Sequence, residues 1–332
     1  MQPRRRVRKL AGLAGTFLLV LAVLLFNACG GAEEPAETEE KEQTPVTTTP
    51  EVSEFEVVRD AVGDYLGDKA GNITATDLHL MIAEGNAPYI VSLRSAEDYA
   101  AGHIPGAVNM KFGDLQTLPK DEEIVVYCYT GQSGSFGAAM LGVLGYDVQN
   151  LRHGMASWSD DPAVYKSRFD PTTDQADFEV ETTANMGGSY SLPELDNTTS
   201  TDEDEIIRAA AKTVSPKYIT ASDLNLKIAE GQDMTIVSCR SAEHYAAGHI
   251  PEAVNIGLGD LVNKLSKIDP DSPVYVYCYT GHSAAQGTAL LQMLGYDAYS
   301  LKFGMCSWSS DPAVNMGACF DASMVAGYEV EK

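Results

Sequence analysis

The sequence predicts an α/β protein with two similar domains, each built on a parallel β-sheet that helices cover on both faces. Two observations predict this class. The chain repeats itself, and inside each repeat short apolar runs alternate with helical segments that begin at a polar cap and end at glycine. Each repeat has roughly 130 residues, which is enough for a hydrophobic core of its own.

The repeat extends over most of the chain. Residues 73–78, 100–105 and 124–133 match residues 219–224, 246–251 and 274–283. The offset is 146 residues in the first two pairs and 150 in the third, which indicates a four-residue insertion near residues 261–273. The predicted division is a signal peptide at 1–28, a disordered acidic tether at 29–52, a first domain at 53–181, a linker at 182–204 and a second domain at 205–332.

The elements of the first repeat follow from its caps and apolar runs. Thr74 and Asp77 are spaced as a helix cap, Gly85 closes that helix, and Ser95 with Asp98 starts another helical turn. The predicted strands are residues 89–93, 124–127 and 148–151, and a further helix is predicted over 137–144. Because ligands of such sheets bind beyond the carboxyl ends of the strands, Cys128 and Cys278 lie where a site is expected.

The first residues have the pattern of an export signal. Five basic residues precede the apolar stretch from Leu10 to Phe26, and Ala28 precedes Cys29. The pattern resembles a lipoprotein signal, which implies lipidation of Cys29, although an uncleaved anchor and an ordinary secretory signal stay open. We therefore expect an extracytoplasmic lipoprotein on the periplasmic side of a bacterial membrane, attached to that membrane through its lipid anchor only.

Charge and composition limit the partners. The segment from Ala32 to about Glu51 is rich in Glu, Thr and Pro and has no aromatic residue, so it cannot bury enough apolar surface to fold. The formal net charge of the whole chain is −24, and loss of the basic signal makes it more negative. Such acidity argues against nucleic acid as a partner and is typical of a solvated surface.

The six cysteines match between the repeats only at Cys128 and Cys278. A disulfide framework shared by both domains is therefore not predicted, but a local disulfide within the second repeat, for instance between Cys306 and Cys319, stays open. No convincing metal site is predicted, because each repeat offers few histidines and no matching cysteine pair.

Each of the two matching cysteines ends an apolar run and precedes a short polar loop and a helix. Backbone amides of such a loop and the positive end of the helix favour the thiolate, so a reactive nucleophile is expected. A buried structural cysteine is the alternative. The recurrence of the loop in both repeats favours catalysis by Cys128 and Cys278.

The surrounding motifs resemble a rhodanese domain. They are residues 92–94, Glu97, Tyr99, 102–107, 128–133 and 154–158 in the first copy, with Arg240, Glu243, Tyr245, 248–253, 278–283 and 304–308 in the second. This resemblance covers nearly all of both repeats and implies two tandem rhodanese-like domains. It also implies a thiosulfate sulfurtransferase that carries sulfane sulfur as a cysteine persulfide and uses no cofactor. The implied donor is a small sulfur-containing anion, and the acceptor is cyanide or a thiol.

Loop length separates this reaction from phosphate chemistry. Relatives of the fold that act on phosphate or arsenate have an arginine six residues after the cysteine, whereas this chain has Gly134 and Ala284 there. Without a guanidinium to hold a tetrahedral oxyanion, the phosphatase alternative is disfavoured.

The candidate residues fall into two groups. The persulfide-binding loops are Tyr129, Thr130, Gly131, Gln132 and Ser133, with Tyr279, Thr280, Gly281, His282 and Ser283. Loop amides are expected to stabilise the persulfide, with the serine hydroxyls as further donors. His282 is expected either to titrate near neutral pH or to be exposed without a task.

The supporting residues are assigned from the resemblance. It implies that Arg94 pairs with Glu97, and Arg240 with Glu243, to support the loops. Ser92 and Ser238 replace the usual aspartate two residues before each arginine. His103 and His249 are read as turn and packing residues.

Two functions are therefore predicted as alternatives. The first is a sulfurtransferase with two competent sites, since many tandem relatives keep only one cysteine. The second is a carrier or sensor that accepts persulfide from a sulfur-relay protein without efficient turnover of small donors.

Overall fold

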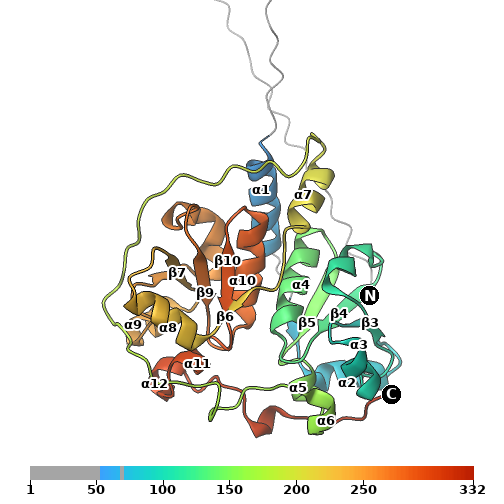
Figure 1. Ribbon diagram of the computed structural model, residues 1–332. Coiled ribbons are helices and arrows are strands. Elements are labelled where there is room, and N and C mark those ends of the chain that lie inside the picture. The colour runs from blue at the N-terminus through green and yellow to red at the C-terminus, as the bar shows by residue number, and fades with distance from the viewer. Residues whose placement is uncertain (1–52, 68–70) are drawn as a thin grey trace, which may run out of the picture. The chain divides into compact units, whose positions relative to one another are not determined.

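The computed structural model describes residues 53–67 and 71–332 (Figure 1). The predicted signal peptide, the lipidation site Cys29 and the acidic tether lie outside these residues. Among the helices of the described part, none is long and apolar enough to cross a membrane.

Two five-stranded parallel sheets confirm the predicted α/β class. The first has the order β1-β5-β4-β2-β3, and the second has the equivalent order β6-β10-β9-β7-β8. The strands of the first sheet are β1 (Asn72–Ile73), β2 (Tyr89–Ser92), β3 (Val108–Asn109), β4 (Glu123–Tyr127) and β5 (Asp147–Leu151). Those of the second are β6 (Tyr218–Ile219), β7 (Thr235–Ser238), β8 (Val254–Asn255), β9 (Val274–Tyr277) and β10 (Ala298–Leu301). In each sheet the cysteine-bearing strand is central, so its carboxyl end is flanked on both sides.

The helices also occur in equivalent sets. The first domain has α1 (Glu54–Gly67), α2 (Ala75–Ala83), α3 (Ala96–Ala101), the 3₁₀ helix η1 (Phe112–Thr117), α4 (Gln132–Val143), α5 (Met155–Trp158) and α6 (Pro162–Tyr165). The second has α7 (Glu203–Ala211), α8 (Ala221–Ala229), α9 (Ala242–Ala247), η2 (Leu258–Asn263), η3 (Leu265–Lys267), α10 (His282–Met293), α11 (Met305–Trp308), α12 (Pro312–Asn315) and η4 (Ala322–Met324). The short helix η3 lies in the region near residues 261–273 where the insertion is predicted.

The cap signals of the sequence are confirmed. Thr74 Oγ1 accepts a hydrogen bond from the Asp77 N–H at 3.1 Å, and Ser95 Oγ caps α3 in the same way. The helix predicted over 137–144 begins earlier, at Gln132, and α1 was not predicted. The early part of α4 contains Gly134 and Gly137, which have low helix propensity. Tertiary packing favours them there, since a β-carbon at Gly134 would lie 2.2 Å from Asn150 Oδ1.

One large hydrophobic cluster contains residues of both domains, and each domain has a further cluster of its own around Trp158 or Trp308. The buried members of the large cluster include Phe55 and Phe136 of the first domain and Ile206, Leu261 and Leu290 of the second. Figure 1 shows α4 and α10 side by side between the two sheets, and these helices are in contact. Since α4 and α10 each follow a cysteine loop, their contact also brings the two loops toward each other.

The segment after each domain packs against the other domain. The tail at Glu181 forms an antiparallel bridge with His249, and Glu331 forms the equivalent bridge with His103. The indole N–H of Trp308 donates to Glu179 O at 2.9 Å, and the indole of Trp158 donates to Glu329 O at 3.0 Å. The C-terminal end accordingly lies beside α2 and α3 of the first domain (Figure 1). The repeated tail sequence therefore serves to join the domains.

Candidate active site

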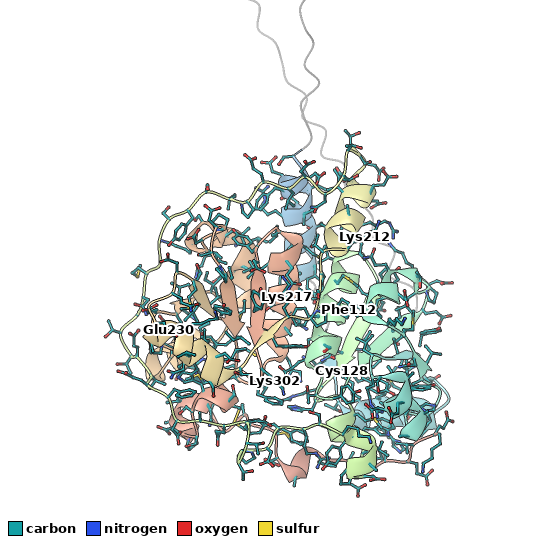
Figure 2. The ribbon with its side chains drawn as sticks, in the orientation of Figure 1. Phe112, Cys128, Lys212, Lys217, Glu230 and Lys302 are labelled. Carbon is teal, nitrogen blue, oxygen red and sulfur yellow. A yellow bond between two sulfur atoms is a disulfide. The ribbon has the colours of Figure 1, made fainter. Side chains whose placement is uncertain are left out.

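Each cysteine follows the last residue of a central strand. Cys128 comes directly after β4, and Cys278 comes directly after β9 (Figure 2 labels Cys128). Gly131 and Gly281 precede the following helices with φ of +79° and +87°. This left-handed conformation suits glycine and lets the chain turn from strand to helix within four residues. Both cysteines are only 3% exposed, so the thiols lie inside the protein.

One backbone amide of the second loop points at its cysteine sulfur. The Gly281 N–H donates to Cys278 Sγ at 3.2 Å. The preceding carbonyls are held from the other side, because the Met305 N–H donates to Cys278 O at 2.9 Å and the Cys306 N–H donates to Tyr279 O at 3.0 Å. Such a loop stabilises negative charge on sulfur without any charged side chain.

The first loop is held by the same backbone contacts. The Met155 N–H donates to Cys128 O, and the Ala156 N–H donates to Tyr129 O, both at 2.9 Å. The start of α5 therefore fixes the Cys128 loop as the start of α11 fixes the Cys278 loop.

Gly154 and Gly304 support the cysteine loops but are absent from the predicted site residues. Their φ values are +55° and +56°, and each lies directly beneath a cysteine loop. A β-carbon at Gly154 would lie 2.3 Å from Cys128 O and 2.8 Å from Gly131 N. At Gly304 it would lie 2.6 Å from Cys278 O. The sequence did contain a signal for these glycines, because Gly154-Met155 and Gly304-Met305 are separated by 150 residues, as Cys128 and Cys278 are.

Tyr129 and Tyr279 point away from the thiols, although both belong to the predicted loops. The Tyr129 hydroxyl donates to the Asp98 carboxylate at 2.5 Å, and the Ser95 N–H donates to the same hydroxyl at 3.1 Å. The hydrogen bond from Tyr129 lowers the pKa of Asp98 below its ordinary value. In the second domain His244 takes the place of Asp98 and bonds to the Tyr279 hydroxyl. These tyrosines anchor the loops to α3 and α9.

The expected arginine–glutamate pairs are replaced by contacts to the backbone. Arg94 is buried and donates to the carbonyls of Gly102, Asp98 and Val164 at 2.7, 2.6 and 2.7 Å. Arg240 is equally buried and donates to the carbonyls of Val314 and Gly248.

Glu97 and Glu243 are exposed, and no ion pair involves either of them within the described residues. The expectation fails because each arginine turns inward to reach carbonyls at the ends of two short helices. The arginines therefore support the site, but the two glutamates do not.

The two cysteine loops meet at the domain interface. The first helical residue of α4 and that of α10, Gln132 and His282, are both buried and reach the opposite domain. His282 Nε2 lies 3.0 Å from Thr130 O, and the Phe303 N–H donates to Gln132 Oε1 at 3.2 Å. The structure thus brings the predicted loops together as one composite site.

Two segments of the chain, residues 74–161 and 220–311, match the family described as rhodanese-like domain, and together they span more than half of the chain. The chain belongs to the rhodanese-like domain family. The prediction of two tandem rhodanese domains is confirmed.

Some curated relatives of these rhodanese domains are named as sulfurtransferases, and one is named as a transcriptional regulator. A thiosulfate sulfurtransferase GlpE of Shewanella oneidensis is 30% identical over 93 residues, which are 28% of this chain and 91% of that protein. A sulfurtransferase of Allochromatium vinosum is 28% identical over 92 residues, which are 27% of this chain and 86% of that protein. An HTH-type transcriptional regulator of Mycobacterium tuberculosis is 32% identical over 108 residues, or 32% of this chain, and the chain spans 47% of that protein's length.

A small cavity of about 20 Å³ lies between the rhodanese loops. Thr130 and Thr280 line it, as expected from their positions, together with His153, His282 and a mainly aromatic wall. Its volume is close to that of one water-sized group. His153 is buried, and its Nε2 has no hydrogen-bond partner among residues 53–67 and 71–332.

The two rhodanese sites differ at their serines. Ser133 Oγ and the Tyr218 hydroxyl of the second domain lie 2.8 Å apart. The residue equivalent to Tyr218 in the first domain is Asn72, whose amide oxygen instead accepts from Asn150 at 2.9 Å. The Cys128 site therefore has a tyrosine from the other domain beside its loop, and burial raises the pKa of Tyr218 above its ordinary range.

The burial of His282 corrects both expectations for this residue. It is not exposed, and desolvation lowers its pKa to about 4, away from neutral pH. His153, which faces it at 4.8 Å between ring centroids, also has a lowered pKa because of burial. Both rings are therefore neutral at physiological pH.

This burial predicts acid sensitivity. In the unfolded chain the pKa of histidine is about 6.5, whereas that of folded His282 is about 4. As the pH falls between these values, the unfolded state binds a proton that the folded state does not, so the free energy of unfolding decreases. His282 alone is expected to reduce the free energy of unfolding by roughly 3 kcal/mol between pH 6.5 and pH 4. Denaturant titrations across this range check the prediction. In His282→Gln the free energy of unfolding should fall less steeply with pH, because only the contribution of His153 remains. Equal falls in the unaltered protein and in His282→Gln would contradict the prediction.

His103 and His249 are packing residues, as the sequence predicts. His103 stacks on Tyr99 with 3.8 Å between ring centroids, and His249 stacks on Tyr245 at 3.7 Å. Each ring also bonds through Nδ1 to the carbonyl of the tyrosine on which it stacks.

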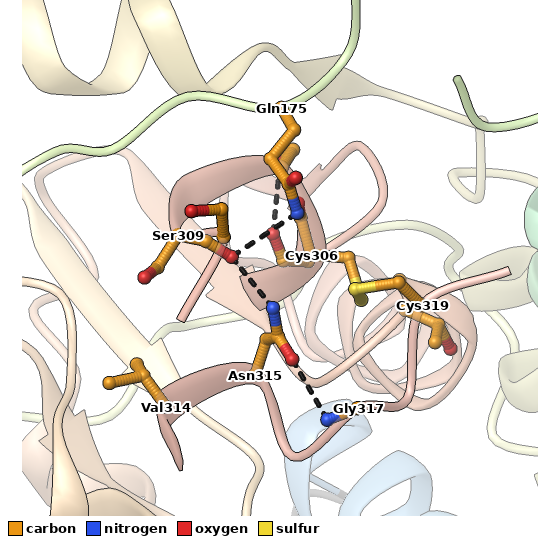
Figure 3. The surroundings of a disulfide bond; sticks show 12 residues. Gln175, Cys306, Ser309, Val314, Asn315, Gly317 and Cys319 are labelled. Carbon is orange, nitrogen blue, oxygen red and sulfur yellow. Dashed lines mark hydrogen bonds between the residues drawn. A yellow bond between two sulfur atoms is a disulfide. The ribbon is translucent and has the colours of Figure 1, made fainter. Parts of the chain in front are cut away.

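Cys306 and Cys319 form a disulfide, which resolves the alternative left open by the sequence (Figure 3). Cys306 belongs to α11, and its N–H holds the Tyr279 carbonyl of the Cys278 loop. The equivalent residue in the first domain is Ala156, so a disulfide borders one rhodanese site only. Cys128 and Cys278 remain thiols.

Proposed function

We propose that this protein is a sulfurtransferase that carries sulfane sulfur as a persulfide on Cys128 and on Cys278. The observation that carries the proposal is the loop amide at the second cysteine, where the Gly281 N–H donates to Cys278 Sγ at 3.2 Å. A persulfide anion on that sulfur would be stabilised by the same amide and by the positive end of the following helix. The names of the two sulfurtransferase relatives support the same reaction.

The proposed reaction has two balanced steps. A cysteine thiolate attacks the outer sulfur of thiosulfate, the S–S bond of thiosulfate breaks, and sulfite leaves with the bonding electron pair. Cyanide or a thiolate then attacks the outer sulfur of the persulfide, and the cysteine leaves as a thiolate. The positive helix end and the loop amides lower the energy of both anionic forms of the cysteine.

The loops also fit a sulfur atom better than a bound phosphate. Gly134 and Ala284 stand where a loop for phosphate would carry arginine, and both are buried in the first turns of α4 and α10. The nearby arginines Arg94 and Arg240 are occupied by backbone carbonyls. The substrate class is therefore a small sulfur donor.

We place this reaction outside the cytoplasm, on a protein anchored by a lipid at Cys29. The basic and apolar signal segment and the small residue before Cys29 support this location. Lipid labelling of the intact chain and of Cys29→Ser tests it, and equal labelling of both would contradict it.

A persulfide carrier or sensor is the second candidate. It is favoured by the deep burial of both thiols and by the relative named as a transcriptional regulator. A carrier would take up sulfur from a relay protein but would turn over thiosulfate poorly.

Thiocyanate formation from thiosulfate and cyanide tests the proposed enzyme. We expect turnover in the intact protein, reduced but measurable turnover in Cys128→Ser and in Cys278→Ser, and none in the double variant. Cys239→Ser serves as the matched control, because Cys239 lies outside both loops. Unchanged turnover in the double variant would overturn the mechanism, and stable persulfide with negligible turnover would favour the carrier.

A further inference from the structure

We propose that His282 and Gln132 are positioning residues that act across the domain interface. Each belongs to one sulfur-carrying loop and orients the loop of the other domain. The inference rests on the proposed function and adds that neither rhodanese site is complete within its own domain.

His282 contacts the first loop at its backbone. Its Nε2 lies 3.0 Å from Thr130 O and 3.3 Å from the His153 amide nitrogen, while its Nδ1 lies 2.8 Å from Thr280 Oγ1. One tautomer donates from Nε2 to the Thr130 carbonyl, and the other accepts at Nε2 from the His153 N–H. In both tautomers Thr280 orients the ring, and the ring holds backbone groups of the first domain.

The contact to Thr130 constrains the peptide group that carries the Gly131 N–H. The Thr130 carbonyl and the Gly131 N–H belong to one planar trans peptide, so they point in opposite directions. A side chain that holds this carbonyl therefore sets the direction of the Gly131 N–H. The counterpart of that N–H in the second loop is the Gly281 N–H, which donates to Cys278 Sγ.

The second contact reaches the support beneath the loop. His153 precedes Gly154, where a β-carbon would lie 2.3 Å from Cys128 O and 2.8 Å from Gly131 N. Phe303 and Gly304 are the equivalent pair in the second domain, and there the Phe303 N–H donates to Gln132 Oε1 at 3.2 Å. The two crossing side chains thus make reciprocal contacts to equivalent backbone groups.

The space at Gly131 and Gly281 shows how closely each crossing side chain approaches the opposite loop. A β-carbon at Gly131 would lie 2.7 Å from His282 Nε2, and one at Gly281 would lie 2.6 Å from Gln132 Oε1. Each crossing side chain therefore lies directly against the helix-capping glycine of the opposite loop. His282 makes the additional bond to a loop carbonyl, so its effect across the interface should be the larger.

The test measures sulfur loading from thiosulfate at one cysteine while the other is serine. In the Cys278→Ser protein, adding His282→Ala should slow loading of Cys128 roughly ten-fold. In the Cys128→Ser protein, adding Gln132→Ala should slow loading of Cys278 by about five-fold. Each loss would occur in the domain that does not carry the substitution.

Three comparisons separate positioning from a general structural defect. His282→Gln should restore most of the Cys128 rate, because glutamine makes the equivalent contact in the other loop. Gln286→Ala removes another buried polar side chain one turn further along α10, and it should leave the ratio of the two loading rates unchanged. Thermal unfolding of each variant shows whether the fold is retained.

The outcomes are distinct. A loss with His282→Ala that is confined to Cys278, or an equal loss with Gln286→Ala, would overturn the inference. If neither single-cysteine protein takes up sulfur, the proposed function fails, and the inference fails with it. Normal loading of both cysteines with no effect of His282→Ala would overturn the inference alone.

Discussion

Substitution of Gly154 by alanine is expected to reduce sulfur loading at Cys128 by at least about 100-fold, because the loop must move to admit the new methyl group. The added β-carbon would lie 2.3 Å from the Cys128 carbonyl oxygen, and φ at this position is +55°. Displacement of the loop would change the direction of the Gly131 N–H, which lies against the same site. Rapid-quench loading with thiosulfate in the Cys278→Ser protein measures the effect.

Gly85→Ala is the matched control for this substitution. Gly85 also has a positive φ, of +75°, but a β-carbon there would meet nothing within 4 Å. It should therefore cost only about 1 kcal/mol of stability and leave loading of Cys128 unchanged. Equal losses in the two variants would show that backbone strain, and not contact with the loop, determines the result.

Substitution of Arg94 by methionine is expected to lower the free energy of unfolding by about 3 kcal/mol or more. The guanidinium of Arg94 donates to three backbone carbonyls, and its Cζ lies 5.5 Å from the centre of the Tyr129 ring. Methionine fills part of the volume but leaves these carbonyls without their charged donor. Urea unfolding measures the change, and loading of Cys128 should fall with it because Tyr129 belongs to that loop.

Arg59→Met provides the surface control. Arg59 forms an ion pair with Asp60 at 2.8 Å on the exposed side of α1, and such pairs contribute little to stability. Its loss should change the free energy of unfolding by less than about 0.5 kcal/mol. A similar small effect of Arg94→Met would contradict the supporting role of the buried arginine.

The regular parts of each domain were predictable from local signals. Thr74, Ser95 and Gly85 mark helix ends through their own hydrogen bonds and backbone angles, and those signals do not depend on the rest of the fold. The cysteine loops were predictable because the strand, the cysteine and the glycine are consecutive in the chain. The start of α4 was not, since glycine and serine in its first turn conceal a helix that tertiary packing stabilises.

The contacts between the domains were not predictable from one sequence. Nothing local to Gln132 or His282 indicates that each side chain is buried against the opposite loop, because the contacts join residues 152 and 171 positions apart. Distance along the chain also explains why a partner of Arg94 was not predicted. Arg94 has Glu97 close by in sequence, but its third acceptor is Val164, which comes from α6. The pairing implied by the family resemblance therefore named the wrong partner.

The two sites share their loop geometry and differ in their surroundings. Cys128 has Tyr218 of the second domain beside its loop, whereas the Cys278 loop is held by an amide of the disulfide-bonded Cys306. The cysteines are therefore expected to differ in rate or in acceptor while using the same reaction.

The number of sulfur atoms that thiosulfate adds to the protein tests the central claim most directly. Intact-mass measurement after loading should find two added sulfur atoms in the unaltered chain, one in Cys128→Ser, one in Cys278→Ser and none in the double variant. Cyanide should remove them all as thiocyanate. Added sulfur in the double variant, or none in the unaltered chain, would contradict persulfide transfer at these two cysteines.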